Sequence, residues 1–118
     1  METLPKLLAK TQKIFNAWIR TRDKGKPCIS CGSYNTAHAS HFYAAGSYTG
    51  LRFNEDNVHL SCVSCNTYKG GNIHEYRKGL EKKIGKDRLQ KLEILSSLNR
   101  YRKWERFELE QIIKKYKK

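Results

Sequence analysis

Apolar residues recur at intervals of three and four positions along the N-terminal part of the chain. This spacing places them on one face of a helix and predicts a helix from Leu4 to about Thr21. Thr3 can cap its first turn, and Gly25 and Pro27 end the helix. The predicted apolar face consists of Leu4, Leu7, Leu8, Ile14, Phe15, Trp18 and Ile19.

The middle of the chain is rich in turn residues and predicts short strands. We expect a first strand over Ala37–Tyr43 and a glycine-containing loop over Ala44–Gly50. A second extended segment is expected over Leu51–Leu60, with an interruption near 54–56. These two segments can pair as a small hairpin.

The second extended segment ends in an alternating pattern. Val58 and Leu60 are predicted on one face of the strand, and Asn57 and His59 on the other. Cys62–Lys69 then fits a short helix, which a glycine pair ends.

Helical patterns return in the last third of the chain. Asn72 is a suitable N-cap with Glu75 three residues later, as in a capping box, and Gly85 interrupts the stripe that follows. A short helix is expected over Asp87–Leu95, and a final helix from about Leu98. The stripe of the final helix consists of Tyr101, Trp104, Leu109, Ile112, Ile113 and Tyr116.

Charge divides the 118 residues into three parts. The chain has 24 Lys and Arg against 11 Asp and Glu, a net charge of +13, and its length fits a single domain. The parts are a basic N-terminal helix (1–27, net +5), a neutral middle (28–77) and basic C-terminal helices (78–118, net +8). Two basic arms favour a polyanionic partner such as DNA, and the alternative is a solvated lysine-rich surface.

The neutral middle contains two C-x-x-C pairs, Cys28 with Cys31 and Cys62 with Cys65. The chain has neither a secretory signal nor an apolar run long enough for a membrane span, so we expect a soluble intracellular protein. In that setting the pairs predict one structural zinc ion with four thiolate ligands. The alternatives are a redox dithiol and buried free thiols.

His41, Asn57 and Asn66 lie between and beside these pairs. A neutral imidazole can accept a proton from water, and a carboxamide oxygen can bind a hard divalent cation. Together they would suit metal-assisted attack on a phosphodiester. Each residue also has a structural interpretation, because Asn66 can cap a helix and His41 can be a core histidine.

The arrangement of these residues resembles the ββα-metal (HNH) nucleases. The likeness is most specific over Lys10–Gly79, where several ungapped strings resemble the NinG (Rap) recombination nucleases of lambda-like phages. The strings are Lys10–Ala17, Arg20–Asp23, Pro27–Gly32, Leu51–His59, and Gly71–Asn72 with Tyr76–Arg77.

The resemblance implies an enzyme that cuts branched DNA, such as displacement loops and Holliday junctions. It implies His41 as the general base, Asn57 as the residue that steadies the hairpin loop and the base, and Asn66 as a ligand of a catalytic Mg²⁺ or Mn²⁺. The four cysteines match the zinc knuckles of the family.

Two positions depart from the family pattern. Ser40 stands where HNH nucleases often have a His or Asp ligand, and His38 stands where NinG-like sequences have Asp. The second ligand of the catalytic metal is therefore open among His38, Ser40 and His59. Arg52 and Lys69 are the basic residues nearest the motif, and either can contact the scissile phosphate or be a solvated surface residue.

We therefore expect an α+β domain over 1–118, with a zinc-stapled ββα-metal core between an N-terminal helix and C-terminal helices. The expected function is an HNH-type DNA endonuclease in the host cytoplasm, with a homodimer possible on junctions. The alternatives are a zinc-stabilised module that only binds DNA, and an HNH enzyme of the restriction or homing type. Longer family members have an N-terminal segment that this sequence lacks, which leaves the range of substrates and partners open.

Overall fold

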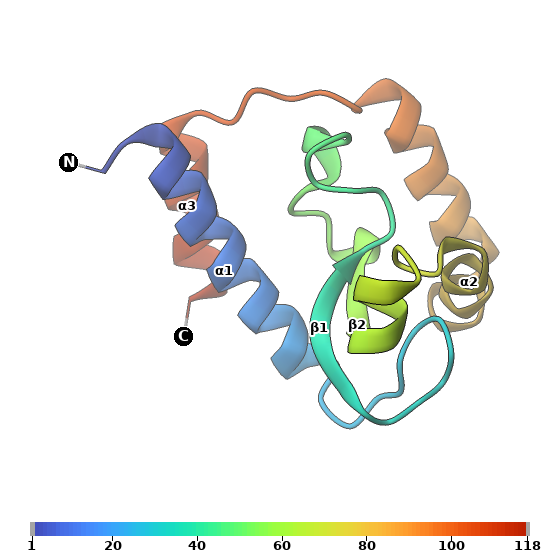
Figure 1. The fold of residues 1–118 in the computed structure, drawn as a ribbon. Helices are drawn as coiled ribbons and strands as arrows, with labels where there is room; N and C mark the ends of the chain where they lie inside the picture. Colours follow the sequence, from blue (N-terminus) through green and yellow to red (C-terminus); the bar gives the residue numbers. More distant parts are fainter. Residues whose placement is uncertain (1, 118) are drawn as a thin grey trace.

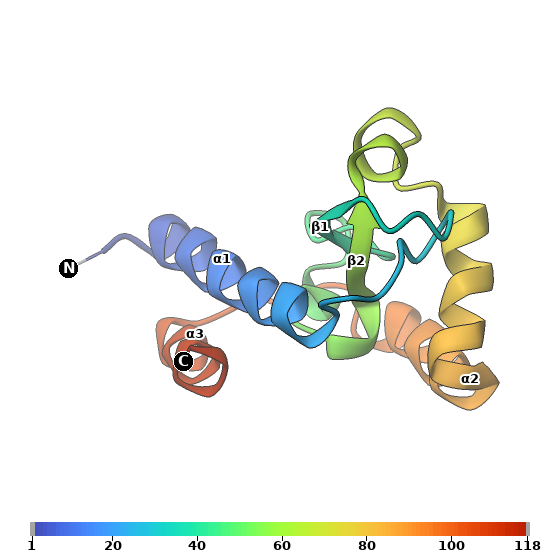
Figure 2. The ribbon, with the colours of Figure 1, turned by 90° about the horizontal axis from the view of Figure 1, so that it is seen from below.

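The computed structural model describes residues 2–117 as a mixed α+β fold built around one two-stranded antiparallel sheet. Helix α1 lies on one side of the sheet and α2 on the other, while α3 returns to lie beside α1 (Figure 1, Figure 2). No helix within the described residues is long and apolar enough to cross a bilayer. The elements are α1 (Leu4–Arg22), β1 (Thr36–His41), η1 (Thr49–Leu51), η2 (Glu55–Asn57), β2 (Val58–Cys62), η3 (Ser64–Tyr68), α2 (Ile73–Leu98) and α3 (Arg106–Tyr116).

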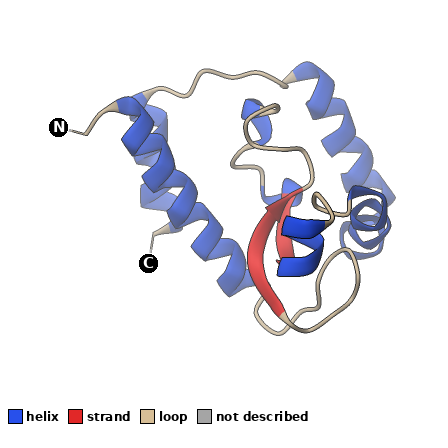
Figure 3. Ribbon diagram, in the orientation of Figure 1, coloured by secondary structure: helices blue, strands red, loops and turns tan. Residues whose placement is uncertain are grey.

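The sheet is a short ribbon whose second strand is enclosed on both faces (Figure 3). His41 pairs with Val58 and Ser40 pairs with His59, and the register is irregular between Thr36 and His38. All five residues of β2 are buried, because α1 packs against this strand and Tyr76 and Lys83 of α2 lie against its His59. The predicted first strand is confirmed, but it begins one residue earlier and ends two residues earlier than Ala37–Tyr43.

The second extended segment was predicted too long. Only its end forms β2, and residues 49–51 and 55–57 form 3₁₀ turns instead. One cause is local, because the Asn54 side chain accepts a hydrogen bond from Asp56 N and closes a turn that a strand cannot contain. Val58 packs into the core between α1 and α3, while Asn57 and His59 are also buried, outside this apolar cluster.

Two apolar clusters hold the helices on the sheet. The first joins α1, α3 and the ribbon, and it contains Leu7, Phe15, Ile19, Phe53, Val58, Leu109 and Tyr116. The second joins the hairpin loop and the segment after α1 to α2, and it contains Ile29, Leu51, Tyr76, Leu80, Leu89 and Leu92. Apart from the exposed Phe107, the apolar residues of α3 therefore pack within the chain, where Tyr116 lies edge-on against Phe15 and Trp18.

Helix α1 is confirmed almost as predicted. It spans Leu4–Arg22, and Thr3 Oγ1 accepts a hydrogen bond from Lys6 N at 3.4 Å. Its stripe of apolar residues supplies the buried positions Leu7, Phe15 and Ile19.

Three helix predictions need correction or refinement. The helix expected over Cys62–Lys69 is a single π-helical turn. Asn72 precedes α2 but forms no side-chain cap, because its φ of +49° is left-handed and its amide donates to Cys65 Sγ at 3.5 Å. Gly85, with a φ of +86°, breaks α2 as predicted, and the second stretch runs on to Leu98.

The final helix begins later than predicted, at Arg106 instead of about Leu98. Residues 99–105 form an extended linker, because their polar groups bond to the hairpin loop and not to one another. Arg102 N donates to Thr49 Oγ1 at 2.7 Å, and Trp104 Nε1 donates to Thr49 O at 2.7 Å. A capping box between Glu105 and Glu108 then starts α3.

Candidate functional site

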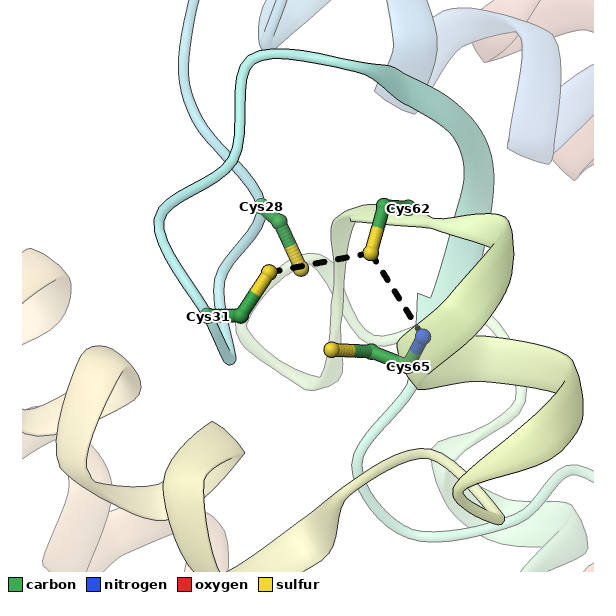
Figure 4. Close-up of side chains that lie close together, drawn as sticks. All are labelled: Cys28, Cys31, Cys62 and Cys65. Atoms are coloured by element: carbon green, nitrogen blue, oxygen red, sulfur yellow. Dashed lines mark hydrogen bonds between the residues drawn. The ribbon is translucent and has the colours of Figure 1, made fainter.

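The four cysteines form one cluster between the turn after α1 and the end of β2 (Figure 4). All four sulfur atoms lie within 4.8 Å of one another, and the Sγ atoms of Cys31 and Cys62 are 3.7 Å apart. Tetrahedral ligands that are each about 2.3 Å from an ion lie about 3.8 Å from one another. The cluster can therefore bind a metal ion such as zinc.

Local backbone geometry brings the cysteines of each pair together. Gly32 has a φ of +79°, and its N–H donates to Cys28 O at 3.0 Å, which closes the first turn. In the second turn, Cys65 N donates to Cys62 Sγ at 3.5 Å. Each C-x-x-C therefore presents two sulfur atoms to the same point.

The first cysteine turn is packed directly against α2. A Cβ atom at Gly79 would lie 1.8 Å from Ile29 O, so only glycine allows this approach. The cysteine cluster thereby fixes the position of the helix that follows η3.

A chain of hydrogen bonds joins β1 to η3. Ser40 Oγ donates to Asn66 Oδ1 at 2.9 Å, and Asn66 Nδ2 lies 2.9 Å from His38 Nδ1. Nδ1 of His38 must accept this bond, because an amide NH₂ group only donates. The structure thus brings together three of the predicted residues, and a lone pair of His38 faces the carboxamide of Asn66.

His41 ends β1 and faces the loop that joins the strands. Its Nε2 lies 3.0 Å from the carbonyl oxygen of Arg52. A carbonyl only accepts, so Nε2 carries the hydrogen and Nδ1 is the free acceptor of the neutral ring. Among the described residues Nδ1 has no hydrogen-bond partner, and it is not one of the buried unpartnered atoms. Nδ1 therefore keeps some exposed surface, on a ring that is otherwise largely buried.

Burial also affects the protonation of His41. Desolvation lowers the pKa of His41 below 6.5, and the charge of Arg52 acts in the same direction, while the bond to the Arg52 carbonyl opposes both. The ring is therefore neutral at neutral pH.

Asn57 holds the hairpin loop in place. It is fully buried, and its Oδ1 accepts from Tyr43 N at 2.8 Å. Its Nδ2 donates to the carbonyl oxygens of Tyr43 and Leu51, each at 3.0 Å. Asn57 therefore fixes Leu51 in the hairpin loop. The residue after Leu51 is Arg52, whose carbonyl oxygen binds the His41 ring.

His59 lies in a different environment from the other candidate ligands. Its Nε2 is 2.8 Å from Asp56 O, and its Nδ1 is 2.8 Å from Lys83 Nζ. Burial and the charge of Lys83 lower its pKa to about 3. Both ring nitrogens are occupied in the described structure, and no hydrogen bond there joins His59 to Asn66. The geometry therefore favours His38 over His59 as the partner of Asn66.

The two predicted phosphate contacts differ in their surroundings. Arg52 is half-buried beside His41, and its Nε donates to Gln12 Oε1 at 2.8 Å. Lys69 is exposed at the end of η3. Gln12 was not among the predicted site residues, although its Nε2 lies 3.4 Å from both His41 Nε2 and Arg52 O.

His41 does not contact the pair formed by His38 and Asn66. Neighbouring residues of a strand point to opposite faces, so His41 faces α1 and the loop, whereas Ser40 and His38 face η3. The Cα atoms of Ser40 and His41 are nevertheless only about 3.8 Å apart. The end of β1 thus carries the predicted base, His41, on one face and the residues that bond to Asn66 on the other.

Comparison with known proteins gives one consistent family. The family model of the bacteriophage lambda NinG protein matches residues 2–118. The chain is 41% identical over 97 residues to protein ninG of Escherichia phage lambda, covering 80% of this chain and 47% of that protein. It is 40% identical over 111 residues to protein ninG of Escherichia phage 933W, covering 92% of this chain and 54% of that protein.

The chain thus spans about half the length of these curated relatives. No solved structure matches it. Because the family model covers nearly the whole sequence, the chain belongs to the NinG family of bacteriophage proteins.

Proposed function

We propose that this chain is a metal-dependent, HNH-type DNA endonuclease that cuts branched recombination intermediates, with His41 as its general base. The observation that carries the proposal is the bond from His41 Nε2 to the Arg52 carbonyl. This bond leaves Nδ1 as a solvent-accessible proton acceptor on a ring that is neutral at neutral pH.

In this mechanism, water attacks the phosphorus atom of a phosphodiester and His41 Nδ1 accepts the proton of that water. The bond from phosphorus to the leaving oxygen then breaks. Asn57 acts as a positioning residue, because its three hydrogen bonds hold the loop that orients the His41 ring. Arg52 lies beside the ring and can hold a phosphate group through charge.

Asn66 and His38 are the residues that would hold the catalytic cation. A turn of the Asn66 carboxamide would place Oδ1 beside His38 Nδ1, and the Ser40 hydroxyl could then accept from the amide nitrogen. One oxygen and one imidazole nitrogen suit Mg²⁺ less well than Mn²⁺. When bound, such a cation stabilises the charge that develops on the phosphate and the leaving oxygen.

Zinc in the cysteine cluster has a structural role in this proposal. Four cysteine ligands leave no open position for water or substrate. The cluster fixes the end of β2 and the start of η3, and so positions Asn66, which directly follows Cys65.

The substrate proposal rests on charge and on family resemblance. A net charge of +13 favours a polyanion, with Lys69 and the C-terminal lysines as further phosphate contacts. Branched DNA as the substrate follows from the resemblance to recombination nucleases, and the host cytoplasm as the site of action follows from a phage origin. A homodimer on junctions is proposed because resolving a junction takes two symmetric nicks. The apolar stripe of α3 packs on α1, so a dimer would use another surface.

A DNA-cleavage assay tests the proposal against the two alternatives. The purified protein would be incubated with linear duplex, single-stranded and four-way-junction DNA, with Mg²⁺, with Mn²⁺ or without added divalent cation. We expect cation-dependent cleavage of the junction. Binding without cleavage under all conditions would favour the DNA-binding module, and sequence-specific cleavage of linear duplex would favour a restriction or homing enzyme.

A further inference from the structure

The linker between α2 and α3 exposes an aromatic side chain that the fold does not use. Tyr101 is 71% exposed and lies outside both apolar clusters. Its neighbour Arg100 places its guanidinium 5.0 Å from the centre of the Tyr101 ring and 4.5 Å from that of Tyr48. A cation therefore lies against two aromatic rings at the surface.

The linker is held in place and does not hang free. Gly50 N donates to Arg100 O at 3.0 Å, and Arg100 Nε donates to Ser47 O at 3.2 Å. The approach is close, because a Cβ atom at Gly50 would lie 1.7 Å from Asn99 O. The exposed ring of Tyr101 is thus attached to a backbone that is fixed before any ligand arrives.

This fixed linker lies against the loop of the candidate active site. Figure 1 shows the linker passing over the turn η1 at the tip of the hairpin loop. Arg52, which directly follows η1, is the residue whose carbonyl holds His41. The hairpin loop therefore binds both the linker that carries Tyr101 and the ring of the proposed general base.

The charge around Tyr101 selects the class of ligand. Arg100, Arg102 and Lys103 flank the ring in sequence and are all exposed, which disfavours an apolar protein partner and favours a polyanion. Aromatic rings and guanidinium groups stack on nucleobases. The bases inside an intact duplex already stack on their neighbours, so an exposed ring can contact only bases that are unpaired or at an end.

We propose that Tyr101, supported by Arg100 and Tyr48, is a stacking site for an unpaired base of branched DNA. The inference rests on the proposed function for the identity of the nucleic acid. It adds a contact by which the protein would distinguish a branch point from continuous duplex. The phosphates beside that base would lie near Lys103, because the Arg102 guanidinium is ion-paired with Glu108.

The test measures binding without added divalent cation, so it does not depend on cleavage. Two DNAs of equal length would be used, a continuous duplex and a duplex with a short unpaired segment containing 2-aminopurine. We expect Tyr101→Ala to weaken binding of the second DNA about tenfold, to remove the quenching of 2-aminopurine, and to leave duplex affinity within about twofold. Tyr101→Trp should retain both signals.

Phe107→Ala is the matched control. Phe107 is an aromatic residue with the same exposure, 71%, but it lies on α3, and among the described residues no guanidinium lies over its ring. We expect this variant to bind both DNAs like the wild type. The inference is overturned if Tyr101→Ala changes both affinities equally or neither, or if Phe107→Ala has the same effect. If the wild-type protein shows this binding difference but cuts no DNA, only the proposed function is overturned.

Discussion

Lys83 Nζ lies 2.7 Å from Oδ2 of Asp23, a carboxylate without exposed surface that lies 60 residues earlier in the chain. Arg22 donates two further hydrogen bonds to the same carboxylate, at 2.8 and 2.9 Å. The backbone N–H of Leu60 adds a fourth, at 3.2 Å. Asp23 thus connects the end of α1, strand β2 and helix α2 through one buried charge.

Replacing this charge should destabilise the fold. We expect Asp23→Asn to lower the free energy of unfolding by about 3 kcal/mol, because it leaves Lys83 and Arg22 without their partner. The value is at the lower end of the range for buried pairs, since each cation keeps about a fifth of its side chain exposed. Urea denaturation measures the change. Asp87→Asn, on an exposed position of α2, is the control and should differ little from the wild type.

The same carboxylate should make stability depend on pH. Burial raises the pKa of Asp23, but the hydrogen bonds from Arg22 and Lys83 outweigh it and hold the pKa well below its ordinary value of 3.8. Its contribution is therefore complete above about pH 4 and is lost as the pH falls below that value. We expect the slope of stability against pH below 4 to be shallower in Asp23→Asn than in the wild type. An unchanged slope would contradict this assignment.

Removing the metal from the cysteine cluster should unfold the domain. We expect one zinc ion per chain by elemental analysis, and loss of cooperative melting in Cys62→Ser, because metal binding contributes directly to folding. Ser64→Ala, at an exposed position between Cys62 and Cys65, should keep both the zinc and the melting transition. A folded, active sample without zinc would refute the structural role.

Gly79 tests the packing of the cysteine turn on α2. Alanine normally stabilises a helix by about 1 kcal/mol relative to glycine, but here its Cβ would overlap Ile29 O. We expect Gly79→Ala to cost about 2 kcal/mol in thermal or urea denaturation. Gly46→Ala, where a Cβ meets nothing within 4 Å, should change stability by less than about 0.5 kcal/mol. Equal effects in the two variants would argue against the close approach.

The sequence predicts best what depends on neighbouring residues. Three features follow from local spacing, and the structure shows each of them. They are the apolar stripe of α1, the break at Gly85 and the two cysteines that each C-x-x-C motif brings together. The linker over 99–105 could not be predicted in this way. The spacing of Tyr101 and Trp104 resembles a helix, but hydrogen bonds to Thr49, about 50 residues earlier, keep the segment extended.

The candidate site shows the same division. His38, Ser40 and Asn66 were all named from the sequence, but only the fold shows that they bond to one another. Histidine is a common metal ligand, yet both ring nitrogens of His59 are hydrogen-bonded, one to Asp56 O and the other to Lys83 Nζ. The partners that decide its role lie in a different part of the sequence, so residue type alone could not distinguish it from His38.

Asn66 should be needed for metal-dependent activity and not for the fold. We expect Asn66→Ala to reduce DNA cleavage at least tenfold at low Mn²⁺, and excess Mn²⁺ to restore part of the rate. Melting temperature and zinc content should stay close to the wild type, because Asn66 is half-buried and, within the described residues, its side chain bonds to Ser40 and His38 alone. Thr67→Ala, at the exposed next position, is the control. Activity that is unchanged at every Mn²⁺ concentration would exclude Asn66 as a ligand.

The role of His41 can be separated from binding and stability. We expect His41→Ala to cut junction DNA at least about a hundredfold more slowly, the usual effect of losing a general base, with junction affinity and zinc content unchanged. His74→Ala, at an exposed position of α2, should cut at the wild-type rate. Since burial lowers the pKa of His41 below 6.5, the wild-type rate should rise with pH only below that value and be level above it. Rates measured across pH 5–8 check this profile, and near-normal cleavage by His41→Ala would exclude His41 as the base.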